Sequence, residues 1–305
     1  MIELTVNGQK LPLGELRMKT RRTGGAGMVT AFTPDLGVPL ALGSRVRLSR
    51  GGEGVFAGYL FCLEENGDGR VLTAYDQLRY LLYRDTKVFS GKTAGEIVRE
   101  ICGERGLALG EAAGSYRIPS LIADNRPLLD IIRTAIERTA AATGERLCFY
   151  DGCGTLQLKP ESAMALPLKI DGGGLLCSYS LTADIGRDSY NRVQIVRKNR
   201  KSGRRDIFVR EDRESIARWG TLQYCAQAAA NATDGEIAAR MEALLQQKNR
   251  ALEALTLQCA GDLRFQAGRI AGVSLPGREG RWRIEEAEHL LSDGAAEMKL
   301  KLTHL

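Results

Sequence analysis

The chain has 305 residues, of which 44% are apolar and 26% are charged, the balance of an ordinary globular protein of two or three domains. No stretch approaches the ~20 apolar residues of a membrane-spanning helix, and the first residues read as a strand rather than a signal peptide, so we expect synthesis in the cytoplasm. Only two histidines, His289 and His304, are present, which removes most of the usual acid–base and metal chemistry of enzymes.

The first part of the chain, residues 1–84, reads as all-β. The 35 glycines, against 8 prolines, gather in turn-like clusters between alternating segments, a pattern that favours many short strands. Asn7-Gly8 predicts a tight hairpin between strands at 2–6 and 9–13, because both central residues tolerate positive φ. Further strands are predicted at 28–32, 45–49, 55–63 and 70–75.

The strand at 55–63 is apolar on both of its alternating faces. A small barrel has only one inward face, so the outward face should pack on another domain or another subunit. We therefore take Val55, Tyr59 and Phe61 as candidate interface residues.

Residues 85–165 read as a small α+β module. Thr93 and Glu96 form a capping box that opens a helix, and Gly106 ends it. A second helix opens near 125–127 and ends at Gly144, and a hairpin at 147–150 and 155–158 closes the module.

Residues 166–305 return to strands, predicted at 175–182, 192–197, 206–210, 222–227, 255–259, 281–291 and 297–303. A helix inserted around 232–251 begins at a second capping box, formed by Thr233 and Glu236. In the last strand three apolar residues alternate with Lys299 and Lys301, as expected for a half-buried strand at the edge of a sheet, whose free backbone edge needs a partner. These apolar residues complete the candidate interface: Met298, Leu300 and Leu302.

The positive charge is concentrated in one segment. The net charge is +6, and residues 190–213 hold nine Arg or Lys against three acids, which accounts for the whole excess. The centre of the segment carries no aromatic ring to stack on bases, so a solvated hairpin tip is favoured over a nucleic-acid reader. This basic patch consists of Arg197, Lys198, Arg200, Lys201, Arg204 and Arg205.

No catalytic, cofactor-binding or metal-binding residues are predicted. The seven cysteines lie in apolar contexts and read as reduced core residues, and Cys148 and Cys153 lack the further ligands of a zinc site. Neighbouring acids, Glu64-Glu65 and Glu285-Glu286, point to opposite faces of a strand. A hydrolase that works through two carboxylates stays open as an alternative, since acids far apart in sequence can meet in the fold.

The order of the elements and several short phrases resemble the baseplate-hub (tail tube initiator) proteins of contractile phage tails, in particular the XkdQ/YqbQ group. More distantly, the chain is similar to the late-control gene D proteins and to the N-terminal part of type VI secretion spike proteins. The phrases that carry the resemblance are colinear from about residue 70 onward: 75–82, 92–98, 116–121, 188–193, 215–223 and 282–300.

The resemblance implies mixed β and α+β structure: two small β-barrel, tube-like domains at 1–84 and 166–305, with the helix-rich module at 85–165 between them. It implies a non-enzymatic structural subunit that forms a trimeric ring and joins the tail tube protein to the central spike protein, among other baseplate proteins. No cofactor, no specific nucleic acid and no membrane span are expected. The alternatives are a cell-wall (peptidoglycan) hydrolase and a cell-wall binding component of the tail.

Overall fold

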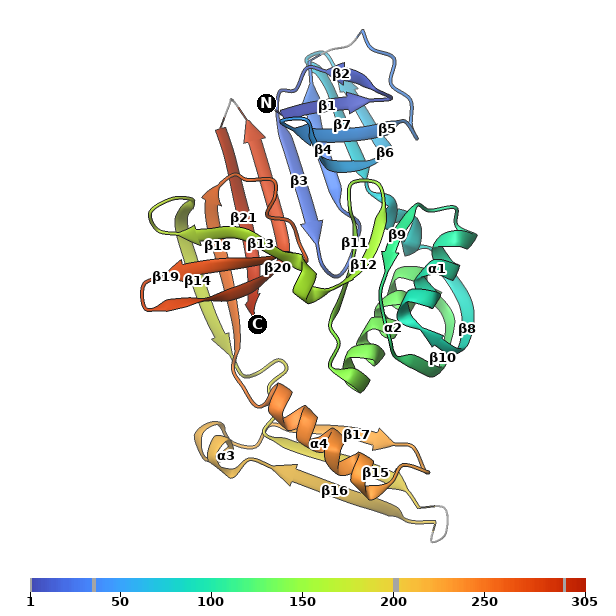
Figure 1. Cartoon of the computed structure of the whole chain (residues 1–305). Coiled ribbons are helices and arrows are strands. Elements are labelled where there is room, and N and C mark those ends of the chain that lie inside the picture. Colours follow the sequence, from blue (N-terminus) through green and yellow to red (C-terminus); the bar gives the residue numbers. More distant parts are fainter. Residues whose placement is uncertain (1, 35–36, 200–202, 293–294) are drawn as a thin grey trace. The chain divides into compact units, whose positions relative to one another are not determined.

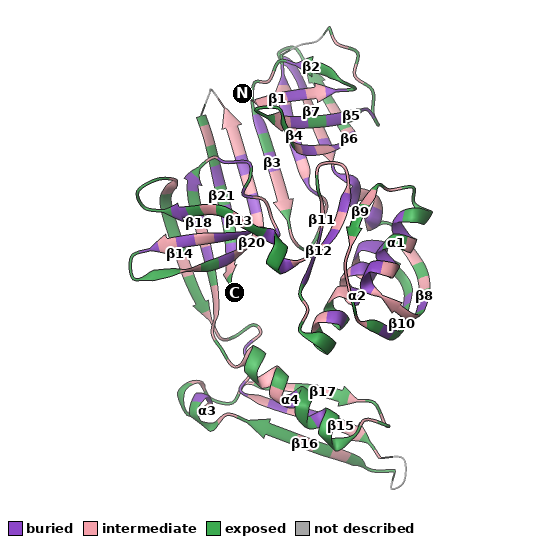
Figure 2. Cartoon of the chain, viewed as in Figure 1, coloured by how far each residue is buried: buried purple, intermediate pink, exposed green. Residues whose placement is uncertain are grey.

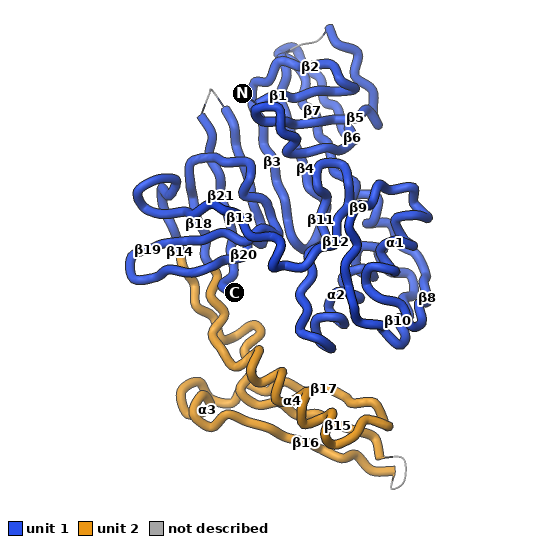
Figure 3. The backbone as a smooth tube through the Cα atoms, in the orientation of Figure 1, with its two compact units in different colours: residues 1–180, 255–305 blue, residues 181–254 orange. Residues whose placement is uncertain are grey.

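The computed structural model describes residues 2–34, 37–199, 203–292 and 295–305 (Figure 1). The chain divides into two compact units, one of residues 1–180 and 255–305 and the other of residues 181–254 (Figure 3). Each unit has its own hydrophobic core, and each is described separately below.

The N-terminal strands of the first unit form an antiparallel arrangement around an apolar core. The predicted hairpin at Asn7-Gly8 is confirmed, with φ of 50° and 83° at its two central residues. The core includes Leu4, Leu48 and Leu72, and Leu263 from the C-terminal part joins it. The strands are β1 (Ile2–Val6), β2 (Gln9–Leu11), β3 (Leu16–Arg21), β4 (Met28–Thr33), β5 (Arg45–Arg50), β6 (Glu53–Asn66) and β7 (Gly69–Tyr75).

The C-terminal strands continue the same sheet. Strand β20 pairs antiparallel with β3, from Leu16 opposite Leu291 to Arg21 opposite Glu286 (Figure 1). The described strands form one 13-stranded sheet in the order β14-β18-β21-β20-β3-β4-β7-β6-β5-β1-β2, with β13 and β19 branching from β20. The added strands are β13 (Ala165–Asp171), β14 (Leu176–Asp184), β18 (Leu252–Ala260), β19 (Ile270–Leu275), β20 (Arg278–Ser292) and β21 (Ala295–His304).

The predicted mostly β class is confirmed, but its finer description is not. The pairings of the described strands leave an open sheet that runs from β14 to β2, and none of them closes a barrel. The two barrels therefore stay a prediction, as do the domain limits 1–84, 85–165 and 166–305.

The predicted helices of the α+β module are present in the first unit. The capping box of Thr93 and Glu96 opens α1 (Ala94–Glu104), and α2 (Leu128–Thr143) ends at Gly144 with φ of 75°. The helices bury Ile97, Ile101 and Ile132 against strands β8 and β10. The other elements here are η1 (Gln77–Leu82), β8 (Arg84–Thr93), β9 (Leu109–Ala112), β10 (Arg117–Pro127), β11 (Leu147–Asp151), β12 (Leu156–Pro160) and η2 (Glu161–Met164).

The second unit, residues 181–254, is a two-layer α/β structure. Its sheet has the order β16-β15-β17, with β15 (Arg192–Lys198) in the centre, β16 (Arg205–Glu211) antiparallel to it and β17 (Gln223–Ala228) parallel to it. Helix α4 (Asp234–Lys248), opened by the predicted capping box, packs Ile237 and Met241 onto this sheet. The short helix α3 (Arg213–Trp219) follows β16.

Candidate interaction surfaces

The outward face of β6 carries an aromatic cluster that the structure covers from within the chain. Phe61 packs edge-on against Tyr75, with ring centroids 5.4 Å apart, and Tyr59 packs edge-on against Tyr80 at 5.7 Å. The Arg79 guanidinium lies over both Phe61 and Tyr75, at 5.7 and 5.6 Å from the ring centroids. Such aromatic and cation–π contacts each contribute about 0.5–1.5 kcal/mol beyond simple burial.

Segment η1 therefore supplies part of the partner predicted for this face, since Arg79 and Tyr80 both belong to it. Tyr59 and Phe61 remain half-buried rather than fully covered. Val55 packs on the N-terminal core, and its carbonyl oxygen accepts a hydrogen bond from Gln266 at 3.0 Å. A role in an intermolecular interface stays a prediction for all three residues.

The last strand, β21, turns its apolar residues into the core of the chain itself. Met298, Leu300 and Leu302 are at most 2% exposed. The alternating Lys299 and Lys301 are exposed, as predicted. The predicted edge position of this strand is wrong, because β21 pairs with β18 on one side and with β20 on the other. A contact of this strand with another chain would therefore use its lysine face.

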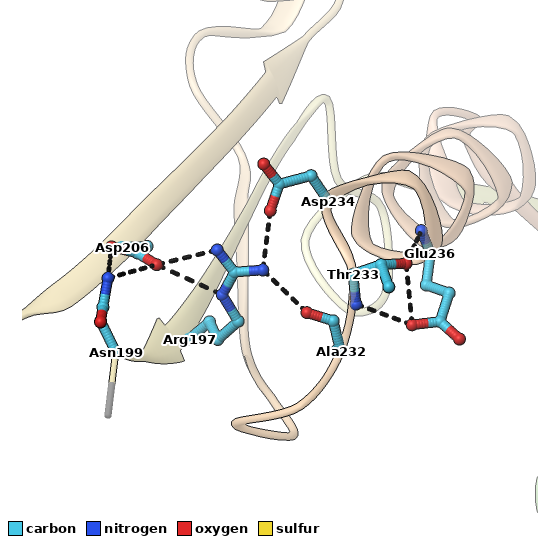
Figure 4. A network of polar contacts seen from close by, with 7 residues as sticks. All are labelled: Arg197, Asn199, Asp206, Ala232, Thr233, Asp234 and Glu236. Carbon is cyan, nitrogen blue, oxygen red and sulfur yellow. Dashed lines mark hydrogen bonds and ion pairs between the residues drawn. The ribbon is translucent and has the colours of Figure 1, made fainter. Parts of the chain in front are cut away.

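Arg197, the first residue of the predicted basic patch, is committed to contacts within the second unit (Figure 4). Its guanidinium forms ion pairs with Asp206 at 2.8 Å and with Asp234 at 2.7 Å, and it donates to the Ala232 carbonyl oxygen. The pKa of Asp206 is lowered by hydrogen bonds from Arg197 and Asn199. Arg197 thus connects β15, β16 and the start of α4.

The rest of the basic patch divides into two groups. Lys198, Arg204 and Arg205 are exposed on the β15–β16 hairpin, which has the strands that the sequence predicts. Arg200 and Lys201 lie outside the described residues. The role of this patch as a binding surface stays a prediction.

His289 occupies a position that suits a core residue better than a catalytic base. It is fully buried in β20, where Nε2 lies 3.0 Å from the Phe265 carbonyl oxygen and Nδ1 has no hydrogen-bond partner among the described residues. Burial lowers its pKa to about 4, so the ring is neutral at physiological pH. His304 packs edge-on against Trp282 at 4.9 Å.

The three buried cysteines lack the environment of a nucleophile. All seven are free, and burial raises the pKa of the Cys102 and Cys148 thiols to about 11 and that of Cys259 to about 12. Thiols with such pKa values are protonated at neutral pH and react slowly. Within the described ranges, no three His, Cys, Asp or Glu side chains meet as metal ligands would.

Three of the four neighbouring acids named in the sequence form ion pairs. Glu285 bonds to Arg22 and Arg283, both at 2.7 Å, and Glu286 bonds to Lys301 at 3.1 Å. Glu65 is held by Arg70 at 2.8 Å. These ion pairs connect neighbouring strands, so the carboxylates have a structural role.

Two carboxylates, the buried Asp76 and the half-buried Asp151, were not singled out from the sequence. Asp76 accepts hydrogen bonds from the backbone N–H groups of Gly27 and Leu78, and Asp151 accepts one from the Gln77 N–H. Burial is the main cause of the raised pKa of both, and the charge of Asp151 adds to the effect on Asp76. Asp76 is the N-cap of η1, and Asp151 accepts from the first residue of η1, so both carboxylates stabilise the turn into this segment. Their role becomes visible only from the backbone N–H groups that donate to them.

Exposed apolar pairs are the other feature that periodicity did not reveal. Val88 and Ile122 face each other across β8 and β10 and are 67% and 70% exposed. Ile207 and Val209 on β16 are also exposed.

None of the helices in the described part of the chain has both the length and the apolar character needed to cross a bilayer.

Solved structures with the same fold are phage tail proteins and related secretion components. The prophage MuSo2 43 kDa tail protein of Shewanella oneidensis matches with a TM-score of 0.70 and 14% identity, over 99% of this chain and 98% of that one. A tail protein of Neisseria meningitidis gives a TM-score of 0.71 at 11% identity, over 99% and 96% of the two chains. The c3393 protein of Escherichia coli, a type VI secretion component, gives 0.59 at 10% identity, over 99% and 76%.

The sequence comparisons agree with the structural ones. Two proteins of Bacillus subtilis match over 74% of this chain: the uncharacterized protein YqbQ, at 26% identity over 69% of its length, and the phage-like element PBSX protein XkdQ, at 25% over 70%. The model of the YqbQ-like family matches residues 16–303, nearly the whole sequence. On this match, the chain belongs to the YqbQ-like family.

Proposed function

We propose that this chain is a structural hub subunit of the baseplate of a contractile phage tail or phage-tail-like particle. The observation that carries the proposal is the fold, which matches a prophage tail protein and a second tail protein, each over 99% of the chain. Its relative XkdQ is described as a protein of a phage-like element. The subunit is made in the bacterial cytoplasm and then assembled into the particle.

The hub is a homotrimer in this proposal. The described sheet ends in two outer strands, β14 and β2, and β13 pairs only with β19. Open strand edges are normally covered or blunted, because they pair readily with other chains. A closed ring of three subunits, in which neighbouring sheets complete two tube-like domains per chain, covers these edges.

The partners in the proposal are the tail tube protein, the central spike protein and other baseplate proteins. Support comes from the c3393 protein, which is described as structurally similar to the phage T4 tail proteins gp27 and gp5, and from the structure of the Francisella PdpA-VgrG complex, which matches with a TM-score of 0.57. Neither a specific nucleic acid nor a cofactor is part of the proposal.

The oligomeric state tests the hub assignment. We expect multi-angle light scattering to give the mass of three chains across a concentration series, either for the protein alone or after co-expression with the spike or tube protein. Stable oligomers bury about 2,000 Å² or more at each obligate contact, so the trimer should persist on dilution. A strictly monomeric protein under both conditions would contradict the assignment.

Cell-wall hydrolysis is the alternative activity, and it is tested separately. We expect no cleared band at the mass of this chain in a peptidoglycan zymogram, because His289 is buried as a neutral ring and Glu285 and Glu286 are held in ion pairs. A known muramidase on the same gel is the positive control. Clearing that is lost on heat denaturation would establish an enzyme and refute the structural role as the sole function.

A further inference from the structure

The sheet of the second unit has two unlike faces. Along β15, Val193 and Ile195 are buried beneath Ile237 and Met241 of α4. The intervening residues of β15 point to the opposite face, because side chains alternate along a strand. Among the described residues of the 181–254 unit no helix packs on that face, and β16 is largely exposed along its length (Figure 2).

The uncovered face, called the open face here, has an apolar centre. It comprises Gln194, Val196 and Lys198 on β15, Arg205, Ile207 and Val209 on β16, and the exposed Cys225 and Gln227 on β17. Val196 stands directly opposite Ile207, and Gln194 opposite Val209. Ile207 is 62% exposed and Val209 is 42% exposed, whereas Phe208, between them, packs on the core beneath α4.

One end of the open face carries two cations, two positions along each strand from the apolar pair of Val196 and Ile207. Lys198 and Arg205 are directly opposite each other across the strands, and neither forms an ion pair with a described residue. Like charges in that position destabilise a sheet. At the other end, Arg192 is neutralised by Glu211 at 3.0 Å.

From this arrangement we propose that the open face is a docking site for an amphipathic helix of another baseplate protein. The apolar side of the helix packs on Val196, Ile207 and Val209, and its acidic side chains meet Lys198 and Arg205. Three strands at about 4.8 Å spacing span about 10 Å, which matches the diameter of one helix. The bound helix would give the sheet a second covered face, as α4 covers the first. The inference rests on the hub function proposed above.

Charge complementarity favours this occupant over two others. Self-association through two open faces would leave the cations unmatched, because the acid at its border, Glu211, is already paired with Arg192. Nucleic acid would meet the cations, but the apolar centre offers no aromatic ring for a base to stack on.

The test is photo-crosslinking inside assembled particles. Benzoylphenylalanine is placed at position 207 in the full chain, the particles are purified and irradiated, and the crosslinked peptide is identified by mass spectrometry. The matched control is position 239 on the exposed side of α4, where Ala239 is replaced. We expect position 207, and not position 239, to crosslink to an acidic, amphipathic segment of another baseplate protein.

The charged end is tested in the same particles. Combining Lys198→Glu with Arg205→Glu should lower the crosslink yield at position 207 by more than about tenfold, because like charges at an interface cost several kcal/mol. Lys198→Arg, which keeps the charge, should preserve the yield.

Three results would overturn the proposal. With the chain present in the particles, these results are a crosslink from position 207 to a second copy of this chain, a crosslink to nucleic acid, and the absence of any crosslink. Each of them would refute the docking site and leave the hub function standing. Absence of the chain from the particles would refute the hub function, and the docking site with it.

Discussion

Replacing Leu300 by aspartate is expected to lower the free energy of unfolding by at least about 4 kcal/mol, since it combines the loss of a buried leucine with an unpaired buried charge. Leu300 is 0% exposed and lies opposite Ala287 of β20, in the middle of the pairing between β20 and β21. Because a domain of this kind is stable by only about 5–15 kcal/mol, the variant should lose much of its folded population.

Urea denaturation followed by circular dichroism measures the effect. The matched control is Lys299→Asp, which places the same side chain one residue earlier on the exposed face of β21 and should cost less than about 1 kcal/mol. Leu300→Ala should fall between the two, at about 2–5 kcal/mol. Equal stability of Leu300→Asp and Lys299→Asp would show that β21 is not packed as described.

Acidification is expected to weaken the fold through His289. The pKa of this ring is lowered from 6.5 to about 4, mainly by burial. Between pH 6.5 and pH 4 the ring is therefore protonated in the unfolded chain but neutral in the folded chain. The His289 contribution is therefore complete above about pH 6.5 and falls by about 3 kcal/mol as the pH drops to about 4.

The variant His289→Gln isolates this contribution. The glutamine amide can still donate to the Phe265 carbonyl oxygen but does not titrate. The difference in unfolding free energy between wild type and variant should shift in favour of the variant by about 3 kcal/mol from pH 7 to pH 4. His304→Gln, at an exposed position, is the matched control.

Measuring the difference between variants matters, because other groups titrate in the same range. Asp76 and Asp151 have raised pKa values and act in the opposite direction, whereas Glu285 has a lowered pKa and acts in the same direction. A difference curve that is flat from pH 7 to pH 4 would mean that His289 is not buried as a neutral ring.

Local signals in the sequence predicted the longer helices α1, α2 and α4, but not the short helix α3 or the paired strands β8 and β10. The two capping boxes, at Thr93 and Thr233, open α1 and α4 as expected, because each is formed by residues three positions apart. The turn at Asn7-Gly8 and the β15–β16 hairpin follow from equally short spacings. The β-rich class was predicted from the many short alternating segments, and the family resemblance was predicted from the order of the elements along the chain.

Contacts between distant segments could not be predicted in the same way. The pairing of β3 with β20 joins residues about 270 positions apart, and nothing in either strand identifies the other. Arg197 shows the same limit, because its charge placed it in the basic patch while the ion pair with Asp234 depends on how α4 packs. For the same reason the partner of the β6 aromatic face was predicted to exist, but Tyr80 was not identified.

The pairing of β3 with β20 also sets an order of events during synthesis. Strand β3 is made among the first residues, yet its neighbour on one side, β20, emerges from the ribosome only after residue 292 has been added. At about 5–20 residues per second, the N-terminal strands wait roughly 15–60 seconds with that edge unpaired. During this interval a nascent chain could pair with another nascent chain instead, so slow or crowded translation should increase aggregation before the protein ever reaches its particle.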